Sequence, residues 1–185
     1  MFTASLCRSF LRAPLLAAVA LVAVSGAAVQ ADETGFTLKN GQLRAGYLTH
    51  GIASDESGTQ DLNAEWLLPA FDFGQMGGFS LHPQVGGDFN LQGRTNAAYV
   101  GFAGIYQFSN GIFVEGDLGG SVNDGYKTAP ANSGRSELGC NELFREAFVV
   151  GVPLTSRLSV MAVAEHMSNA NLCQPNNGIT NVGMK

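Results

Sequence analysis

A histidine and a serine two residues apart are the part of this sequence whose residue types could carry out chemistry. They are His166 and Ser168, at the end of an apolar segment of alternating polarity. If this segment is a β-strand, residues i and i+2 project from one face, about 7 Å apart at Cα. An imidazole beside a hydroxyl supplies a general base and a nucleophile, the minimum for acyl transfer. For a bare His-x-Ser pattern, the simpler alternative is a polar pair where a strand meets water.

The first 31 residues have the pattern of a secretory signal peptide. Arg8 and Arg12 form a basic region, residues 14–24 are apolar, and Val29 and Ala31 are the small residues that a signal peptidase site requires. The apolar run is too short for a membrane-spanning helix. We therefore expect residues 1–31 to be removed on export and residues 32–185 to form one domain.

Composition excludes several kinds of partner. The chain has a net charge of −5, which removal of the basic leader makes more negative, so nucleic-acid binding is not expected. The mature chain keeps two cysteines, Cys140 and Cys173, and neither has a histidine at metal-ligand spacing. Two cysteines are too few for a zinc cage, and we expect no metal or other cofactor. An oxidising compartment would let the two form a disulfide.

The rest of the chain consists of short alternating segments and has no run of about twenty apolar residues. Most segments have the length of a tilted transmembrane β-strand, and an even number can close without a free edge. We therefore predict an all-β fold, an eight-stranded antiparallel transmembrane β-barrel. The expected strands are 42–53, 61–68, 79–90, 95–108, 111–123, 143–152, 157–167 and 179–185.

The last expected strand is apparently truncated. Residues 179–185 are fewer than the nine to eleven or so that a tilted strand needs to span a bilayer. Either the chain is a fragment or the barrel closes imperfectly, which would leave backbone polar groups unpaired at membrane depth.

The links between strands indicate an orientation. The second, fourth and sixth links are residues 69–78, 109–110 and 153–156, and two of the three are tight turns, whereas the odd-numbered links include the longest, 124–142. Outer-membrane barrels have short periplasmic turns and longer extracellular loops. We therefore expect both termini on the periplasmic side.

Strand parity then places the His/Ser pair on a face. The apolar set of segment 157–167 has the parity of His166 and Ser168, so the pair should face the bilayer near its outer rim. Glu165 has the other parity and should point inward, into a hydrogen-bond network with residues such as Arg145. In the same way, residues 98, 100, 102, 104, 106 and 108 form the lipid-facing set of the fourth strand.

The two cysteines fit this topology. When the sixth and seventh strands fold about a turn near Thr155, Cys140 and Cys173 both lie beyond the outer strand ends. A disulfide between these loops is geometrically reasonable, and it would restrain the loop that follows Ser168.

The residues around the pair resemble a known family. Segment 166–178, with residues 139–140 and 144–146 upstream, is similar to the lipid A 3-O-deacylases, the PagL-type acyloxyacyl hydrolases. Residues 44–50, 61–65, 98–101, 113–116 and 118–120 share the likeness, which therefore covers nearly all of the mature chain.

The resemblance implies an eight-stranded barrel in the outer membrane of a Gram-negative bacterium, with lipid A or lipopolysaccharide as substrate and outer-membrane lipids around it. Such an enzyme hydrolyses the ester-linked acyl chain at the 3-position of lipid A. Ser168 would be the nucleophile, His166 the base, and Asn169 part of the oxyanion hole. Whether the barrel forms a homodimer stays open.

One position departs from the family. The family has a carboxylate about fourteen residues after the histidine, and Thr180 stands there in this chain. A threonine hydroxyl can orient the ring but cannot neutralise an imidazolium, and loss of such a carboxylate commonly costs orders of magnitude in rate. Glu142, Glu146 and Asp124 are the candidate substitutes, and the sequence does not choose among them.

Two other functions therefore stay under consideration. One is a catalytically weak or inactive barrel of the same descent, with a structural or lipopolysaccharide-binding role. The other is a small pore, which eight strands disfavour because side chains fill the interior.

Other notable side chains have structural interpretations. His50 and His82 are expected at the interface or in the lumen, and Trp66, Tyr47 and Tyr106 are expected to anchor the barrel at the membrane interface.

Overall fold

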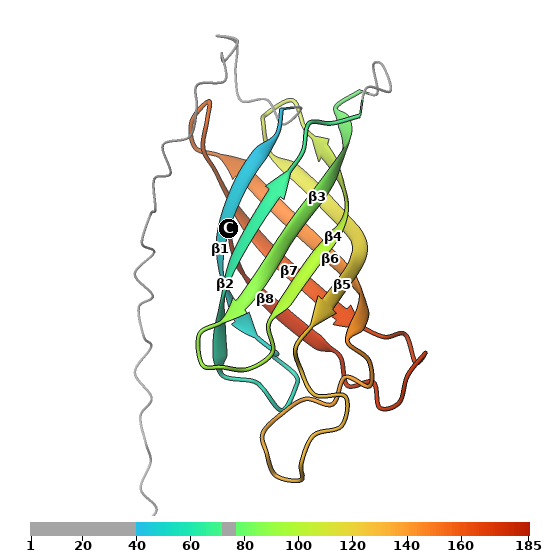
Figure 1. Ribbon diagram of the computed structural model, residues 1–185. Coiled ribbons are helices and arrows are strands. Elements are labelled where there is room, and N and C mark those ends of the chain that lie inside the picture. The colour runs from blue at the N-terminus through green and yellow to red at the C-terminus, as the bar shows by residue number, and fades with distance from the viewer. Residues whose placement is uncertain (1–39, 72–76) are drawn as a thin grey trace, which may run out of the picture. The chain divides into compact units, whose positions relative to one another are not determined.

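The computed structural model describes residues 40–71 and 77–185, and the expected signal peptide lies outside these residues. Eight antiparallel strands follow one another around a closed barrel, in which β8 returns to pair with β1 (Figure 1). This confirms the predicted fold class. The strands are β1 (Gln42–His50), β2 (Thr59–Leu67), β3 (Phe79–Asn90), β4 (Ala97–Gln107), β5 (Phe113–Asn123), β6 (Glu142–Pro153), β7 (Ser159–Ser168) and β8 (Ile179–Met184).

In the residues described, no helix is long and apolar enough to cross a membrane.

The predicted strand boundaries agree with the structure to within two or three residues. The largest difference is in β1, which was expected to reach residue 53 and ends at His50. Gly51 has a φ of 56°, and its carbonyl accepts a hydrogen bond from the Ser54 amide, which turns the chain away from the sheet. Glycine adopts this left-handed conformation without the penalty of a side chain.

The four odd-numbered links lie at one end of the barrel, which we call the long-loop end. These loops are residues 51–58, 91–96, 124–141 and 169–178, and the loop between β5 and β6 is the longest (Figure 1). β7 runs towards this end, so Ser168, its last residue, lies there.

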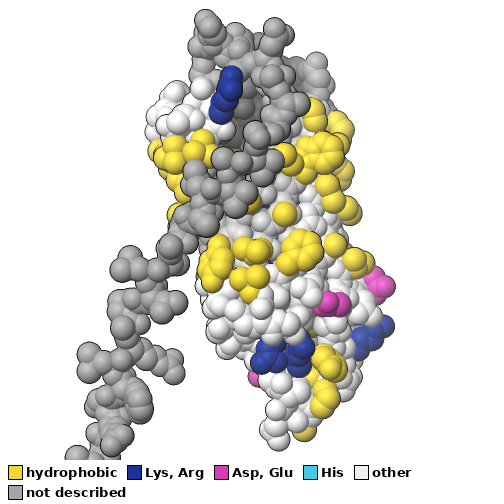
Figure 2. All heavy atoms as spheres, turned by 60° about the vertical axis from the view of Figure 1, so that its left-hand side comes forward, with side chains coloured by type: hydrophobic (Ala, Val, Ile, Leu, Met, Phe, Trp, Pro, Cys, Tyr) yellow, Lys and Arg dark blue, Asp and Glu magenta, His cyan; other side chains and the backbone are white. Residues whose placement is uncertain are grey.

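Side chains alternate along the strands between an apolar outer face and a largely polar interior. In β4, Val100 and Phe102 are more than half exposed, whereas Tyr99 and Ile105 are buried, as parity predicted. Hydrophobic side chains spread over the outer surface in Figure 2, while most of the charged side chains visible in that view lie near its lower end. Tyr47, Trp66 and Tyr106 also point outward, each about half exposed.

Although β8 is short, it closes the barrel. It pairs with β7 from Ile179 to Met184 and with β1 at three positions, Tyr47 to Thr49. Hydrogen bonds from the Ile52 amide to the Thr180 carbonyl, and between Met161 and Lys185, extend the pairing at both ends. The sequence left imperfect closure open as one of two alternatives, and the structure shows a closed barrel, because neighbouring backbone supplies hydrogen-bond partners where β8 is short.

Buried ion pairs fill the interior. Arg145 contacts Glu165 at 2.8 Å and Asp117 at 3.3 Å, and its guanidinium lies 3.8 Å from the centre of the Tyr99 ring. The inward orientation predicted for Glu165 and its pairing with Arg145 are thus confirmed. Arg44 binds Glu65 and Glu115 in the same way. An interior packed with paired side chains argues against a pore.

Both histidines of the earlier strands are buried. His50 lies between Asp61 and Glu56, at 2.7 and 3.0 Å, and His82 contacts the Leu68 carbonyl oxygen and the Ser80 hydroxyl. They belong to the interior polar network rather than to the outer face that carries His166.

Replacing Arg145 tests this network. Arg145→Met leaves Glu165 and Asp117 buried without their cation, and removing one partner of a buried ion pair typically costs about 3–5 kcal/mol. We expect a loss of this size in the free energy of unfolding, measured by urea titration in detergent micelles with Trp66 fluorescence. Arg157→Met, an exposed site in the turn before β7, is the control. Equal stability of the two variants would contradict the network's role.

Candidate active site

Strand β7 places the His/Ser pair on the outer face of the barrel. His166 and Ser168 are partly buried and have the outward parity. Glu165, before the pair, and Met167, within it, have the other parity and are buried in the interior. This agrees with the orientation predicted from the apolar alternation. In the described part of the chain, no hydrogen bond joins Ser168 Oγ to the His166 ring, and catalytic contacts of this kind often form only with substrate bound.

Strand pairing sets His166 in a row that runs across four strands. Leu118 on β5 lies opposite Glu146 on β6, Glu146 lies opposite His166 on β7, and His166 lies opposite Thr180 on β8. A second row beside it, towards the other end of the barrel, contains Gly116, Phe148 and Ala164 and is apolar. The polar side chains of Glu146, His166 and Thr180 therefore lie next to an apolar patch on the same outer face.

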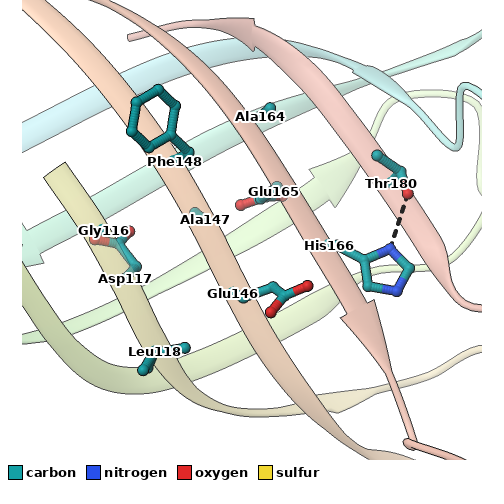
Figure 3. A pocket seen from close by; sticks show the side chains of 10 residues that line it. All are labelled: Gly116, Asp117, Leu118, Glu146, Ala147, Phe148, Ala164, Glu165, His166 and Thr180. Atoms are coloured by element: carbon teal, nitrogen blue, oxygen red, sulfur yellow. Dashed lines mark hydrogen bonds between the residues drawn. The ribbon is translucent and has the colours of Figure 1, made fainter. Parts of the chain in front are cut away.

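Thr180 binds the imidazole directly. Its Oγ1 lies 2.8 Å from His166 Nδ1, the dashed contact in Figure 3. When Nδ1 donates its hydrogen to this oxygen, Nε2 carries the free lone pair that a general base needs. The position where the family has a carboxylate is therefore in contact with the ring, but the contacting group is neutral.

The two rows line a groove of about 480 Å³. Gly116 and Ala164 are the small residues on either side of Phe148, and His166, Thr180 and Glu146 form the polar end of the groove (Figure 3). Asp117 and Glu165 border the groove from the inward face, where Arg145 binds both. The arrangement can hold an apolar chain with its polar attachment next to the imidazole.

Gly178 packs against the imidazole from the loop before β8. Its φ is +59°, and a Cβ built there would lie 2.9 Å from His166 Cε1 and 3.3 Å from Nε2. A side chain at this position would therefore press on the ring, and the backbone conformation also favours glycine. This contact could not be recognised from the sequence, because it depends on how the loop before β8 packs against β7.

Asn169 holds the loop that follows the pair. Its Nδ2 donates to the carbonyl oxygens of Leu138 at 2.7 Å and Pro175 at 3.2 Å, and its backbone amide donates to Asn176 Oδ1. These bonds leave Asn169 no spare donor in this structure. The geometry therefore fits a positioning role better than the direct oxyanion contact that the resemblance implied.

A disulfide joins the same two loops. Cys140 and Cys173 are bonded, with their Cα atoms 5.9 Å apart, so loop 169–178 is attached to loop 124–141 beside the pair. Within the loop, Ala170 and Asn171 have positive φ values of 50° and 63°. Asparagine adopts this conformation comparatively easily, but for Ala170 it is unfavourable and depends on the surrounding contacts, and such strain is common at functional sites.

The amides of Ala170 and Asn171 are free donors. Neither backbone N–H has an acceptor among residues 40–71 and 77–185. They directly follow the segment that contains Ser168, so they are the available donors nearest to it in sequence.

The candidate carboxylates are not equivalent. Asp124 accepts hydrogen bonds from the backbone amide and Nδ2 of Asn96, both at 2.7 Å, and is committed to that loop contact. Glu142 begins β6 and lies beyond the last pair between β6 and β7, Phe144 with Ser168. Glu146 lies directly opposite His166.

Sequence reasoning missed Glu56, which organises the long-loop end. Its buried carboxylate accepts hydrogen bonds from the Thr95 amide and hydroxyl, the Ser136 amide and His50. Burial alone would raise the pKa of this carboxyl, but the hydrogen bonds outweigh it and lower the pKa to about 2. Three loops therefore meet on one charged group that no local pattern in the sequence reveals.

Comparisons with known proteins identify the family and the fold. The family model "Lipid A 3-O-deacylase (PagL)" matches residues 58–185. A solved structure described as "Crystal structure of the outer membrane enzyme PagL" has a TM-score of 0.58 and 19% sequence identity, over 77% of this chain and 94% of that chain. At this identity the likeness shows a shared fold. No curated protein matches the chain. The chain belongs to the PagL family of lipid A 3-O-deacylases.

Proposed function

We propose that this protein is an outer-membrane lipid A 3-O-deacylase that cleaves the 3-linked acyl ester by a Ser/His mechanism. The observation that carries the proposal is the outward-facing His166 imidazole at the polar end of an apolar groove, with the Ser168 hydroxyl two residues further along the same face of β7, in a chain of this family. The proposal includes removal of residues 1–31 on export and insertion with the long-loop end outside the cell.

In the proposed reaction, Ser168 Oγ attacks the ester carbonyl carbon while His166 Nε2 takes the hydroxyl proton. The tetrahedral intermediate collapses when the C–O bond to lipid A breaks, and His166 returns the proton to the departing 3-oxygen. A water molecule then attacks the acyl-serine with the help of the same imidazole. The products are the free 3-hydroxy fatty acid and lipid A with a free 3-hydroxyl group.

The negative oxygen of the intermediate needs hydrogen-bond donors. We assign this role to the backbone amides of Ala170 and Asn171, because they have no acceptor within the described chain. Asn169 and the Cys140–Cys173 disulfide would hold these amides in place, since both connect the loop to residues 138–140.

The groove accounts for the lipid substrate. A barrel of this kind presents its outer face to the bilayer, so the acyl chain can enter sideways without leaving an apolar environment. Gly116 and Ala164 would contact the chain, and the ester would lie next to His166 at the long-loop end.

A second candidate is a catalytically weak or inactive barrel that binds lipopolysaccharide. The specific observation in its favour is Thr180, which contacts His166 where the family has a carboxylate. The two candidates differ in a measurable product, the released fatty acid.

Expression in a Gram-negative host tests the proposal. We expect lipid A from cells with the intact chain to lose the mass of one 3-hydroxy fatty acid in mass spectra. Ser168→Ala and His166→Ala should lower the purified protein's kcat about a thousandfold or more, because nucleophile and base act as one unit. An unchanged acyl pattern with the properly inserted intact protein would exclude the esterase and favour the second candidate.

Filling the groove should impair the use of long acyl chains. A Cβ at Gly116 meets no atom within 4 Å, so Gly116→Phe places its ring in the groove without displacing the barrel. Because each apolar methylene contributes about 0.8 kcal/mol, we expect kcat/KM for long-chain esters to fall about tenfold or more relative to short-chain esters. Val100→Phe, on the outer face of β4, is the control. An equal effect of both substitutions would show that the groove does not hold the chain.

Gly178→Ala should displace the His166 ring. We expect kcat to fall about 10- to 100-fold, since small misplacements of a catalytic group have effects of this size. Gly58→Ala is the matched control, because Gly58 also has a positive φ but no atom within 4 Å of a built Cβ. If both variants keep wild-type kcat in micelle assays of fatty acid release, Gly178 does not set the ring's position.

A further inference from the structure

We propose that Glu146 supplies the negative charge that Thr180 cannot, and so acts as a positioning residue that stabilises the charged form of His166 from the β6 side. The inference rests on the proposed function and deepens it. It assigns the family's missing carboxylate to a different strand of the barrel.

The pairing register brings the two side chains together. Glu146 and His166 are direct partners on adjacent antiparallel strands, and both have the outward parity. Directly opposite residues have Cβ atoms about 4.5–5.5 Å apart. A glutamate at this position can therefore bring its charge within the range of about 4–6 Å over which an opposite charge favours an ionised group. Figure 3 shows the Glu146 carboxylate extending from β6 towards β7, on the side of the sheet that carries the His166 ring.

Glu146 is available for this role. Within residues 40–71 and 77–185, no hydrogen bond or ion pair engages its carboxylate. The other carboxylates near the groove are committed elsewhere, because Glu165 binds Arg145 and Asn181, and Asp117 binds Arg145 in the interior. Glu142 lies four residues away along β6, about 13 Å at the rise of an extended strand.

Without such a role, a charged side chain at the position of Glu146 would only destabilise the barrel. Its neighbours of the same parity, Phe144 and Phe148, are more than half exposed and form part of the apolar outer face. A charged side chain among lipid-facing residues destabilises a barrel, so an ionisable group there points to a function. Pairing with an imidazolium during each turnover gives Glu146 such a function.

Thr180 and Glu146 together then perform the two roles that a single carboxylate has in the family. Thr180 fixes the ring by accepting the Nδ1 hydrogen at 2.8 Å, which sets the tautomer, and Glu146 contributes charge from the opposite side. Charge is the part that a hydroxyl cannot supply, and its effect is larger next to lipid than in water.

The first test compares two glutamates of one strand face. Glu146→Gln should lower kcat about 10- to 1000-fold with KM within about threefold, because the lost interaction acts on the charged imidazole rather than on bound substrate. Glu146→Asp should recover part of the loss. Glu142→Gln, also exposed and outward on β6, should keep kcat within about twofold. Heat-modifiable gel mobility would verify that each variant forms a barrel.

A second-site variant separates this role from others. Thr180→Glu places a carboxylate where the family has one, so it should restore most of the activity of Glu146→Gln, and Glu146→Gln should have little effect in its presence. A change of KM alone, a loss that Thr180→Glu does not rescue, or equal behaviour of Glu146→Gln and Glu142→Gln would overturn the inference.

The same variants distinguish failure of the inference from failure of the proposed function. A wild-type chain without activity that becomes active with Thr180→Glu would support the Ser/His chemistry and reject Glu146 as the substitute. Absence of fatty acid release from both proteins would reject the proposed function, and this inference with it.

Discussion

The pairing register of the closed barrel is the constraint on which the rest of the structure depends. Because side chains alternate along each strand, a slip of one residue would place the buried ion pairs on the outer face and the apolar residues inside. The interior contacts of Arg145 with Glu165 and of Arg44 with Glu115 oppose such a slip. The same register places Glu146, His166 and Thr180 in one row on the outer face, so the interior network determines the geometry of the site.

The interior contacts of the short strand β8 also determine the position of the His166 imidazole. Its inward residue Asn181 donates to Asp61 and Glu165 and accepts from the Gly51 amide, and Lys185 binds Glu65 at 2.9 Å. These interior contacts hold β8 where its backbone pairing with β1 is limited to three positions. Thr180 lies next to Asn181 on the opposite face, so the contacts that close the barrel also fix the hydroxyl that orients His166.

Alternation of residue types was sufficient to predict the eight strands, the outward face of His166 and Ser168, and the inward face of Glu165, on which Arg145 also lies. It was not sufficient to choose among Glu142, Glu146 and Asp124, because the pairing between two strands depends on their register, which parity does not specify. The alternation of residue types also could not predict the long-range contacts of the loops. The side-chain amide of Asn169 donates a hydrogen bond to the carbonyl oxygen of Leu138, more than thirty positions earlier, and the Glu56 carboxylate connects three loops.

The central claim is that an outward-facing serine next to lipid is the nucleophile. Labelling with a lipid-like phosphonate that forms a covalent bond with activated serines tests it most directly, with the modified residue identified by peptide mass spectrometry. The account predicts one label per chain, on Ser168, that disappears in His166→Ala while the barrel stays folded. A folded protein that releases fatty acid from lipid A but carries the label on another residue, or no label, would contradict it.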